Sequence, residues 1–104
     1  MSDFSVGREA VIRRILEGTG EASPSERRAA FENRGLSGSS GALADKVARH
    51  AWKVADEDIE AARASGMSED RIFEIVVCAA VGQANRQYER ALAALETASG
   101  RDRP

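Results

Sequence analysis

The stretch that decides the fold runs from Ser68 to Leu95 and reads SEDRIFEIVVCAAVGQANRQYERALAAL. It begins with a serine that can cap a helix, followed by two acidic residues that suit the positive end of a helix. From Ile72 to Val81 the residues are apolar on nearly every side of a helix, with Glu74 as the one charged exception. A helix that is apolar all round is typical of the centre of a bundle. The sequence therefore predicts a long last helix that forms the hydrophobic centre of the domain.

Beyond Gly82 the same helix becomes amphipathic. Its apolar face carries Ala84, Tyr88, Ala91, Leu92 and Leu95. An apolar face of this kind needs a neighbour to cover it. We expect the residues from about Ser99 to Pro104 to form a frayed tail.

The residues before this helix also favour helices, because Ala, Glu and Arg dominate the intervals between helix breakers. Expected helices cover about 6–17, a second from Ser23 to near Gly35, about 42–54, and about 56–65. The second helix has a strong start signal, since Ser23, Pro24 and Glu26 match a capping box with proline at the first helical position. Residues 35–41, GLSGSSG, are expected to form a flexible connector.

Length and composition indicate one small domain with a thin core. The chain has 104 residues, and its 42% apolar content includes 19 alanines but only 20 Leu, Ile, Val and Phe residues. The net charge of −2 favours a folded chain over a disordered one. We expect a single all-α domain, a bundle of four or five helices. It divides into N-terminal helices with a Gly/Ser connector (1–41), a helical core (42–98) and a tail (99–104).

Several classes of protein are not expected. No apolar run is long enough for a membrane span, and no cationic segment with an apolar stretch marks a signal peptide. Interspersed charges and a pI of about 5.4 argue against nucleic-acid binding. One cysteine cannot form an internal disulfide, so the expected location is cytoplasmic. One His and one Cys supply too few ligands for a zinc site, so we expect neither a metal nor a cofactor.

The stretch from Leu43 to Leu95 resembles the carboxymuconolactone decarboxylase and alkylhydroperoxidase D-like (AhpD-like) family of all-α proteins. The resemblance rests on KVARHAWKVADEDIEAARASGMSEDRIFEIVVCAAVG, and above all on the turn ASGMSED at 64–70 followed by IFEI at 72–75. It implies a helical bundle that assembles into dimers, trimers or hexamers.

The same resemblance implies that the best-known chemistry of the family is lost. The redox-active branch carries C-x-x-C-x-x-x-H before this turn, and the matching positions here hold Ala51, Val54 and Asp58. The proton-relay glutamate of the family would fall at Ser39. The decarboxylase branch keeps the His that Asp58 replaces. Peroxide reduction by a dithiol needs an activated thiolate and a resolving thiol, and this motif supplies neither.

Three side chains remain weak candidates for catalysis. His50 lies in the apolar stripe of the helix over about 42–54, where we expect a core histidine; as a general base it would need a carboxylate partner. Cys78 lies in the most apolar part of the last helix, where an inert buried thiol is expected, with a single-Cys peroxidase as the alternative. Glu74 needs a partner in a bundle core, and we expect an Arg or Lys from another helix or another subunit. The alternative is an acid that lines a small pocket.

Three further side chains are candidates for lining a pocket or an interface, namely Trp52, Asp58 and Tyr88. We expect a homo-oligomer, because alanine-rich helices with wide apolar arcs leave surface that one subunit does not cover.

The preferred function is a divergent family relative without dithiol peroxidase chemistry that binds a small molecule or serves as an oligomeric assembly module. One alternative is a cofactor-free lyase or isomerase, or a single-Cys peroxidase, using Glu74, His50 or Cys78. Another is a structural protein-interaction module. A pocket that holds at least two of His50, Glu74, Asp58 and Trp52 would favour binding or catalysis, and their dispersal would favour the structural role.

Overall fold

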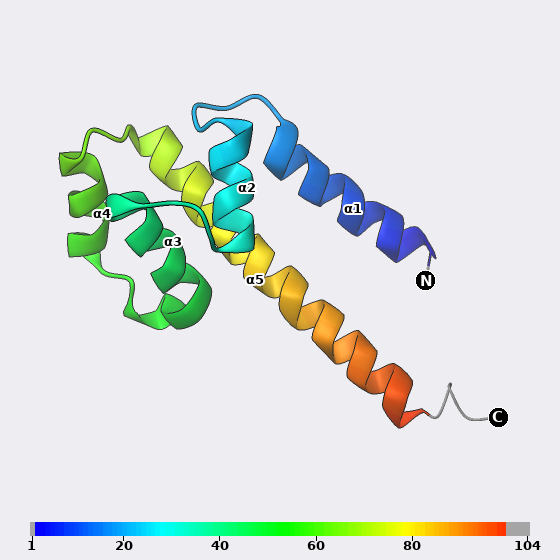
Figure 1. The fold of residues 1–104 in the computed structure, drawn as a ribbon. Coiled ribbons are helices and arrows are strands. Elements are labelled where there is room, and N and C mark those ends of the chain that lie inside the picture. Colours follow the sequence, from blue (N-terminus) through cyan, green and yellow to red (C-terminus); the bar gives the residue numbers. More distant parts are fainter. Residues whose placement is uncertain (1, 100–104) are drawn as a thin grey trace.

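The structure is a computed structural model that describes the backbone of residues 2–99 and the side chains of residues 6–99 (Figure 1). Its elements are α1 (Ser2–Glu17), α2 (Pro24–Glu32), α3 (Gly38–His50), the short 3-10 helix η1 (Ala51–Lys53), α4 (Asp56–Ala64) and α5 (Glu69–Ala98). No strand occurs between residues 2 and 99, so the predicted all-α bundle is confirmed. Ser99 caps the end of α5, and the rest of the expected tail, 100–104, lies outside the described residues.

Local capping signals set most of the helix boundaries. The Ser23 hydroxyl accepts a hydrogen bond from the backbone N–H of Glu26 at 3.1 Å, and the Glu26 carboxylate accepts one from the Ser23 N–H at 3.0 Å. The Ser68 hydroxyl accepts from the N–H of Arg71 in the same way at the start of α5. Gly66 has a φ of +102°, which favours glycine, and it separates α4 from α5.

The expected flexible connector at 35–41 is wrong in its second half, because α3 begins at Gly38. Two contacts hold this first turn. The hydroxyl of Ser39 donates to that of Ser65 at 2.9 Å, and the backbone at Gly41 lies so close to the Leu36 carbonyl that a methyl group there would be 2.7 Å from its oxygen. Glycine is a poor helix former in isolation, but here its small size permits the close contact that starts the helix.

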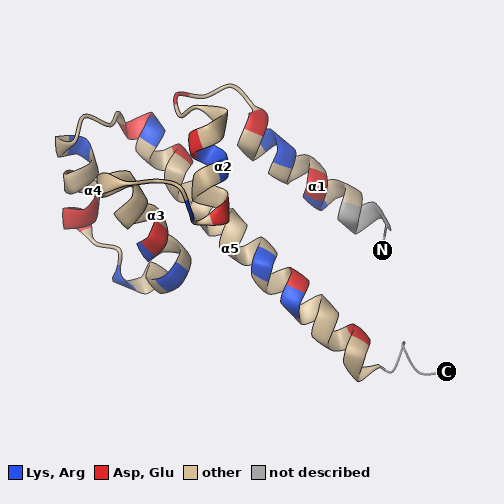
Figure 2. Ribbon diagram, in the orientation of Figure 1, with Lys and Arg blue, Asp and Glu red and all other residues tan. Residues whose placement is uncertain are grey.

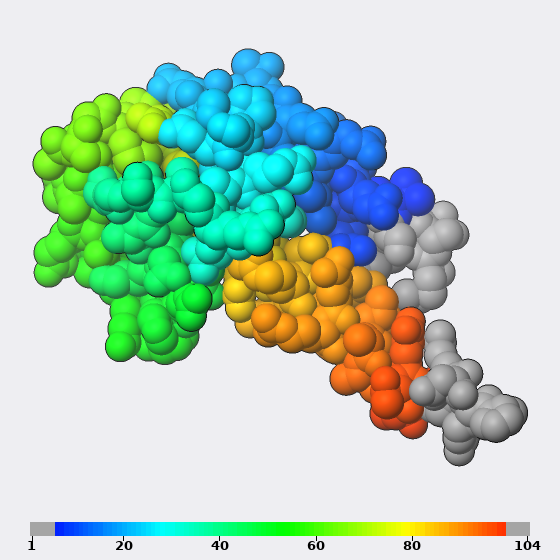
Figure 3. Space-filling view, viewed as in Figure 1, coloured from blue at the N-terminus to red at the C-terminus, as the bar shows by residue number. Residues whose placement is uncertain are grey.

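The long helix α5 is the axis of the molecule. α2 and α3 cross its N-terminal half, α4 lies beside α3, and α1 runs along the other side (Figure 1). The C-terminal half of α5 projects from the body in the space-filling view (Figure 3). The molecule is elongated, with extents of 58 × 28 × 20 Å and a radius of gyration of 16.0 Å, compared with about 13 Å for a compact domain of this length.

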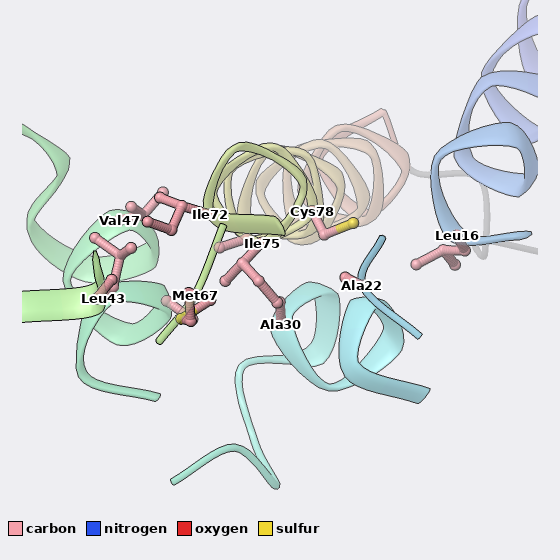
Figure 4. Packing of buried hydrophobic residues seen from close by; sticks show 12 residues of the cluster. Leu16, Ala22, Ala30, Leu43, Val47, Met67, Ile72, Ile75 and Cys78 are labelled. Atoms are coloured by element: carbon pink, nitrogen blue, oxygen red, sulfur yellow. The ribbon is translucent and has the colours of Figure 1, made fainter. Parts of the chain in front are cut away.

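The hydrophobic core lies where α2, α3 and the start of α5 meet (Figure 4). It includes Leu43 and Val47 of α3 and Ile72, Ile75 and Cys78 of α5. The first two helices and the loop between them also contribute, through Leu16, Ala22 and Ala30. The core therefore extends beyond the expected helical core at 42–98, because α2 packs directly against α5.

The expectation that 72–81 is buried all round holds for one face only. Ile72, Ile75, Cys78 and Ala79 are buried, whereas Phe73 is 67% exposed. Ala80 is exposed as well. Phe73 and Ala80 on the far side of α5 therefore meet solvent rather than another helix of the chain.

Charged residues of both signs are scattered over all the helices (Figure 2). Most of the ion pairs are on the surface, where such pairs contribute little to stability. Arg27 is the one buried charged residue among those that the structure describes, at 4% exposed. Its guanidinium donates to the carbonyl oxygens of Ala22 and Ile15, both at 3.1 Å, and so ties α2 to the end of α1. Within the described residues, none of the helices combines the length and the apolar character needed to cross a membrane.

Candidate functional site

The carboxylate of Glu74 is engaged in hydrogen bonds to the backbone. It accepts them from the backbone N–H groups of Glu21 at 3.0 Å and Ala22 at 2.7 Å. The expected Arg or Lys partner is therefore replaced by main-chain donors from the loop between α1 and α2. Gly20 lies against the same carboxylate, since a methyl group on it would be 2.8 Å from the oxygens. Glu74 anchors this loop to α5.

Cys78 is a buried thiol, as the sequence predicts. It is 1% exposed, and its sulfur lies 3.9 Å from the carbonyl oxygen of Ile15. Burial raises the pKa of the Cys78 thiol to about 11, and the opposing charge of Arg27 does not offset this. A thiol with this pKa is almost wholly protonated at neutral pH and is therefore a poor nucleophile.

A small pocket of about 170 Å³ does bring Arg27, Glu74 and Cys78 together. Two of its polar groups are already engaged, however: the Arg27 guanidinium donates to two carbonyl oxygens, and the Glu74 carboxylate accepts from two backbone N–H groups. Arg14 and Thr19 also line this pocket. Arg27 is not predictable as a site residue from the sequence, because none of its neighbours in the chain indicates that it is buried. The pocket is best described as the packing of the α1–α2 loop against α5.

His50 is exposed, so the expected core histidine is wrong. The physical reason is that α3 ends at this residue, where φ is −144° and ψ is 54°, and the chain turns into η1. The imidazole instead meets the edge of the Trp52 ring, with the ring centroids 5.3 Å apart. Trp52 is itself 77% exposed.

Asp58 holds the start of α4. Its carboxylate accepts from the backbone N–H of Ala55 at 2.8 Å and from the Lys46 ammonium at 2.9 Å. These two contacts lower the pKa of Asp58, with the backbone hydrogen bond as the larger cause. Lys46 also ties α4 to α3.

The candidate residues are therefore dispersed. Glu74 lines the pocket beside Cys78, whereas Trp52 lines a different hollow between α3 and α5, and neither lining includes His50 or Asp58. Among the described residues, no three His, Cys, Asp or Glu side chains are grouped so that they could hold a metal ion.

A groove of about 610 Å³ lies between α1 and α5. It is lined by Gly7, Arg8, Val11, Ile12, Val81, Ala84, Asn85 and Tyr88. Arg8 provides its polar contacts, since the guanidinium donates to the Asn85 side chain and lies 4.7 Å from the centre of the Tyr88 ring. Val11 lines the groove and is still 56% exposed, which indicates that the groove is open to solvent.

This groove continues into a longer apolar surface on α5, which we call the open face. The residues of the open face are Phe73, Val77, Ala80, Val81, Ala84, Tyr88, Ala91 and Leu95. By helical geometry they lie on the side of α5 opposite the buried Ile75 and Ala79. Phe73 is 67% and Leu95 64% exposed, so both ends of the face are uncovered.

Helices on both sides form walls along the open face. The groove beside α1 includes Val81, Ala84 and Tyr88, and the hollow beside α3 and η1, of about 500 Å³, includes Ala80 and Ala84. Trp52 stands on the second wall. The C-terminal part of this face is predicted from the sequence, whereas its N-terminal part was expected to lie in the core. The recurrence of apolar residues along the whole of α5 is the signal that joins the two parts.

Comparison of the chain with models of protein families, with curated proteins and with solved structures finds no match.

Proposed function

We propose that this protein is a non-catalytic module that assembles into a homo-oligomer through the open face of α5. The observation that carries the proposal is the exposure of Phe73 and Leu95 at the two ends of one continuous apolar face. A contiguous exposed apolar surface on a small domain is typical of an interaction site. The projecting half of α5 also gains support when a second subunit packs against it, which fits the elongated shape of the single chain.

The dispersal of the candidate catalytic residues supports a non-catalytic role. Glu74 holds a loop, His50 meets Trp52 at the surface, and Cys78 is a buried, protonated thiol. We infer a divergent relative of the carboxymuconolactone decarboxylase and AhpD-like family in which dithiol peroxidase chemistry has been lost. One buried thiol also suits the reducing cytoplasm, where we place the protein.

The size of the particle in solution tests the assembly. We expect light scattering after gel filtration to give a multiple of the subunit mass of 11.2 kDa at micromolar concentration. A mass of one subunit across this concentration range would refute the proposal.

A pair of variants on α5 tests whether the open face is responsible. Leu95→Glu puts a charge on the open face and should shift the particle toward one subunit, because a buried unpaired carboxylate is costly. Ala93→Glu adds the same charge at an exposed position on the opposite side of the same helix and should leave the mass unchanged. Equal effects of the two changes would show that another surface is used.

The peroxidase alternative has its own assay. We expect turnover of an organic hydroperoxide with a dithiol reductant to stay at background for the wild type and for Cys78→Ser. Turnover that disappears in the variant would show that Cys78 is reactive, and the assignment as a non-catalytic module would be wrong.

The groove between α1 and α5 favours small-molecule binding as a second candidate function. Its volume of about 610 Å³ lies in the usual range for ligand pockets. The apolar lining suits an aliphatic chain, and a ligand carboxylate would replace the Asn85 side chain as the acceptor from Arg8. Calorimetric titration with decanoate tests this directly, and binding that is lost in Arg8→Gln while the oligomer persists would support it. No heat of binding in the wild type would rule out this ligand class.

A further inference from the structure

The open face repeats every eleven residues along α5. Phe73, Ala84 and Leu95 are separated by eleven positions, as are Val77 and Tyr88, and Ala80 and Ala91. An eleven-residue repeat corresponds to about 3.67 residues per turn, close to the 3.6 of a straight α-helix. The face therefore runs almost parallel to the helix axis for about 33 Å, at about 1.5 Å per residue.

The open face also has apolar residues at equal sequence distances on both sides of its midpoint. Ala84 is its midpoint, and six of the other seven residues form three pairs equidistant from Ala84; Val81 is left over, because its equidistant position holds Gln87. These pairs are Phe73 with Leu95, Val77 with Ala91, and Ala80 with Tyr88. In two of the three pairs a large side chain is matched with alanine, which is how facing side chains fill space without overlap.

Only one arrangement of two identical helices brings these partners face to face. In an antiparallel pair related by a two-fold axis at Ala84, residue 73 of one copy faces residue 95 of the other, and likewise along the face. Two-fold interfaces use the same patch on both subunits, so a self-complementary face is what such an interface requires. In a parallel pair, by contrast, Tyr88 would face Tyr88 and Phe73 would face Phe73, with gaps at the alanines.

We propose that two copies of this chain pair their α5 helices antiparallel, with the two-fold axis at Ala84. This inference rests on the proposed assembly function and names the partner surface. Ala84 at the crossing point lets the two backbones approach closely. Charged residues of α5 between Phe73 and Leu95, such as Arg86 and Arg90, lie outside the eleven-residue pattern, so α5 itself places no charge between the helices. The guanidinium of Arg8 in α1 lies beside the interface, on the ring of Tyr88.

The walls of the open face complete the interface. A helix about 10 Å wide that covers about 33 Å of the face contacts about 330 Å² of α5. The partner helix also lies between α1 on one side and Trp52 on the other, and both walls add contact area. The area on α5 alone is below the ~800 Å² per partner of a standard stable interface, so the walls must supply the remainder.

Disulfide formation at the axis tests the register. In Ala84→Cys the two new thiols face each other across the two-fold axis, within the range that a disulfide can bridge. Diamide, which takes up the two electrons and two protons of the thiols, should therefore give a covalent dimer on a non-reducing gel. Ala93→Cys is the matched control, because it is exposed on the other side of α5. The wild type, with buried Cys78, should give no covalent dimer.

We expect crosslinking of Ala84→Cys to be at least about tenfold faster than that of Ala93→Cys, because paired thiols have a far higher effective concentration than free ones. Phe73→Cys and Leu95→Cys should crosslink only when the two variants are mixed. Crosslinking of Phe73→Cys with itself would indicate a parallel pair and overturn the inference. An oligomer in which Ala84→Cys is no faster than the control would also overturn the inference while leaving the assembly function intact. A one-subunit mass would overturn both.

Discussion

Replacing Gly82 by alanine tests whether α2 and α5 approach as closely as the structure has them. A methyl group at this position would lie 2.0 Å from the carbonyl oxygen of Phe31, 2.7 Å from its carbonyl carbon and 2.9 Å from its Cα. All three atoms belong to the backbone, so no side-chain rotation relieves the overlap. The two helices must separate by about 1 Å or more to restore ordinary contact distances.

The expected cost can be worked from two opposing effects. Overpacking of a core costs about 1–3 kcal/mol, and displacement of a whole helix places Gly82→Ala at the upper end. Alanine in a helix interior regains about 1 kcal/mol relative to glycine. The net loss is about 2 kcal/mol of unfolding free energy. At about 4–8 °C per kcal/mol for a domain of this size, the melting temperature should fall by about 8–16 °C.

Thermal unfolding followed by circular dichroism at 222 nm measures this change, with all proteins at the same subunit concentration. Gly7→Ala in α1 is the matched control, because nothing lies within 4 Å of a methyl group there. That variant should be more stable by about 0.5–1 kcal/mol through helix propensity alone. If Gly82→Ala melts at or above the temperature of the wild type, the close crossing of α2 and α5 is wrong.

Three further predictions concern single side chains. Glu74→Ala should lower the unfolding free energy by about 1.5–3 kcal/mol and speed amide hydrogen exchange at Glu21 and Ala22, since it removes the acceptor of their N–H groups; unchanged exchange would contradict the anchor role. Burial raises the pKa of Cys78 from 9.0 to about 11, so its thiol ionises first in the unfolded chain. The unfolding free energy of the wild type should therefore fall relative to Cys78→Ala between about pH 9 and 11, by up to about 2–3 kcal/mol, and parallel pH curves for the two proteins would show that the thiol is not buried. Asp58→Ala should lower the melting temperature more than Lys46→Ala does, because the N–H of Ala55 also loses its acceptor. The stability that the ionised Asp58 contributes should be present above pH 3.8 and disappear as the pH falls through its lowered pKa. Acid titration of the melting temperature of the wild type and of Asp58→Ala checks this.

The features that the sequence predicts correctly depend on residues close together in the chain. The capping box of Ser23 and Glu26 spans three residues, and the cap at Ser68 acts on the N–H of Arg71. Gly66 ends a helix through its own backbone conformation. Such signals act within one helical turn, so they need no knowledge of the rest of the molecule.

The sequence also determined that α5 is apolar on two sides, but it did not determine which side the subunit buries. The tertiary structure decided this through the crossing of α2 at Gly82, which turns Ile75 inward and leaves Phe73 in solvent. It likewise gave Glu74 backbone partners more than fifty residues away. It also ended α3 at His50, before the apolar stripe was complete. Contacts between distant segments depend on how whole helices pack, and helical periodicity specifies a face without specifying the neighbour that covers it.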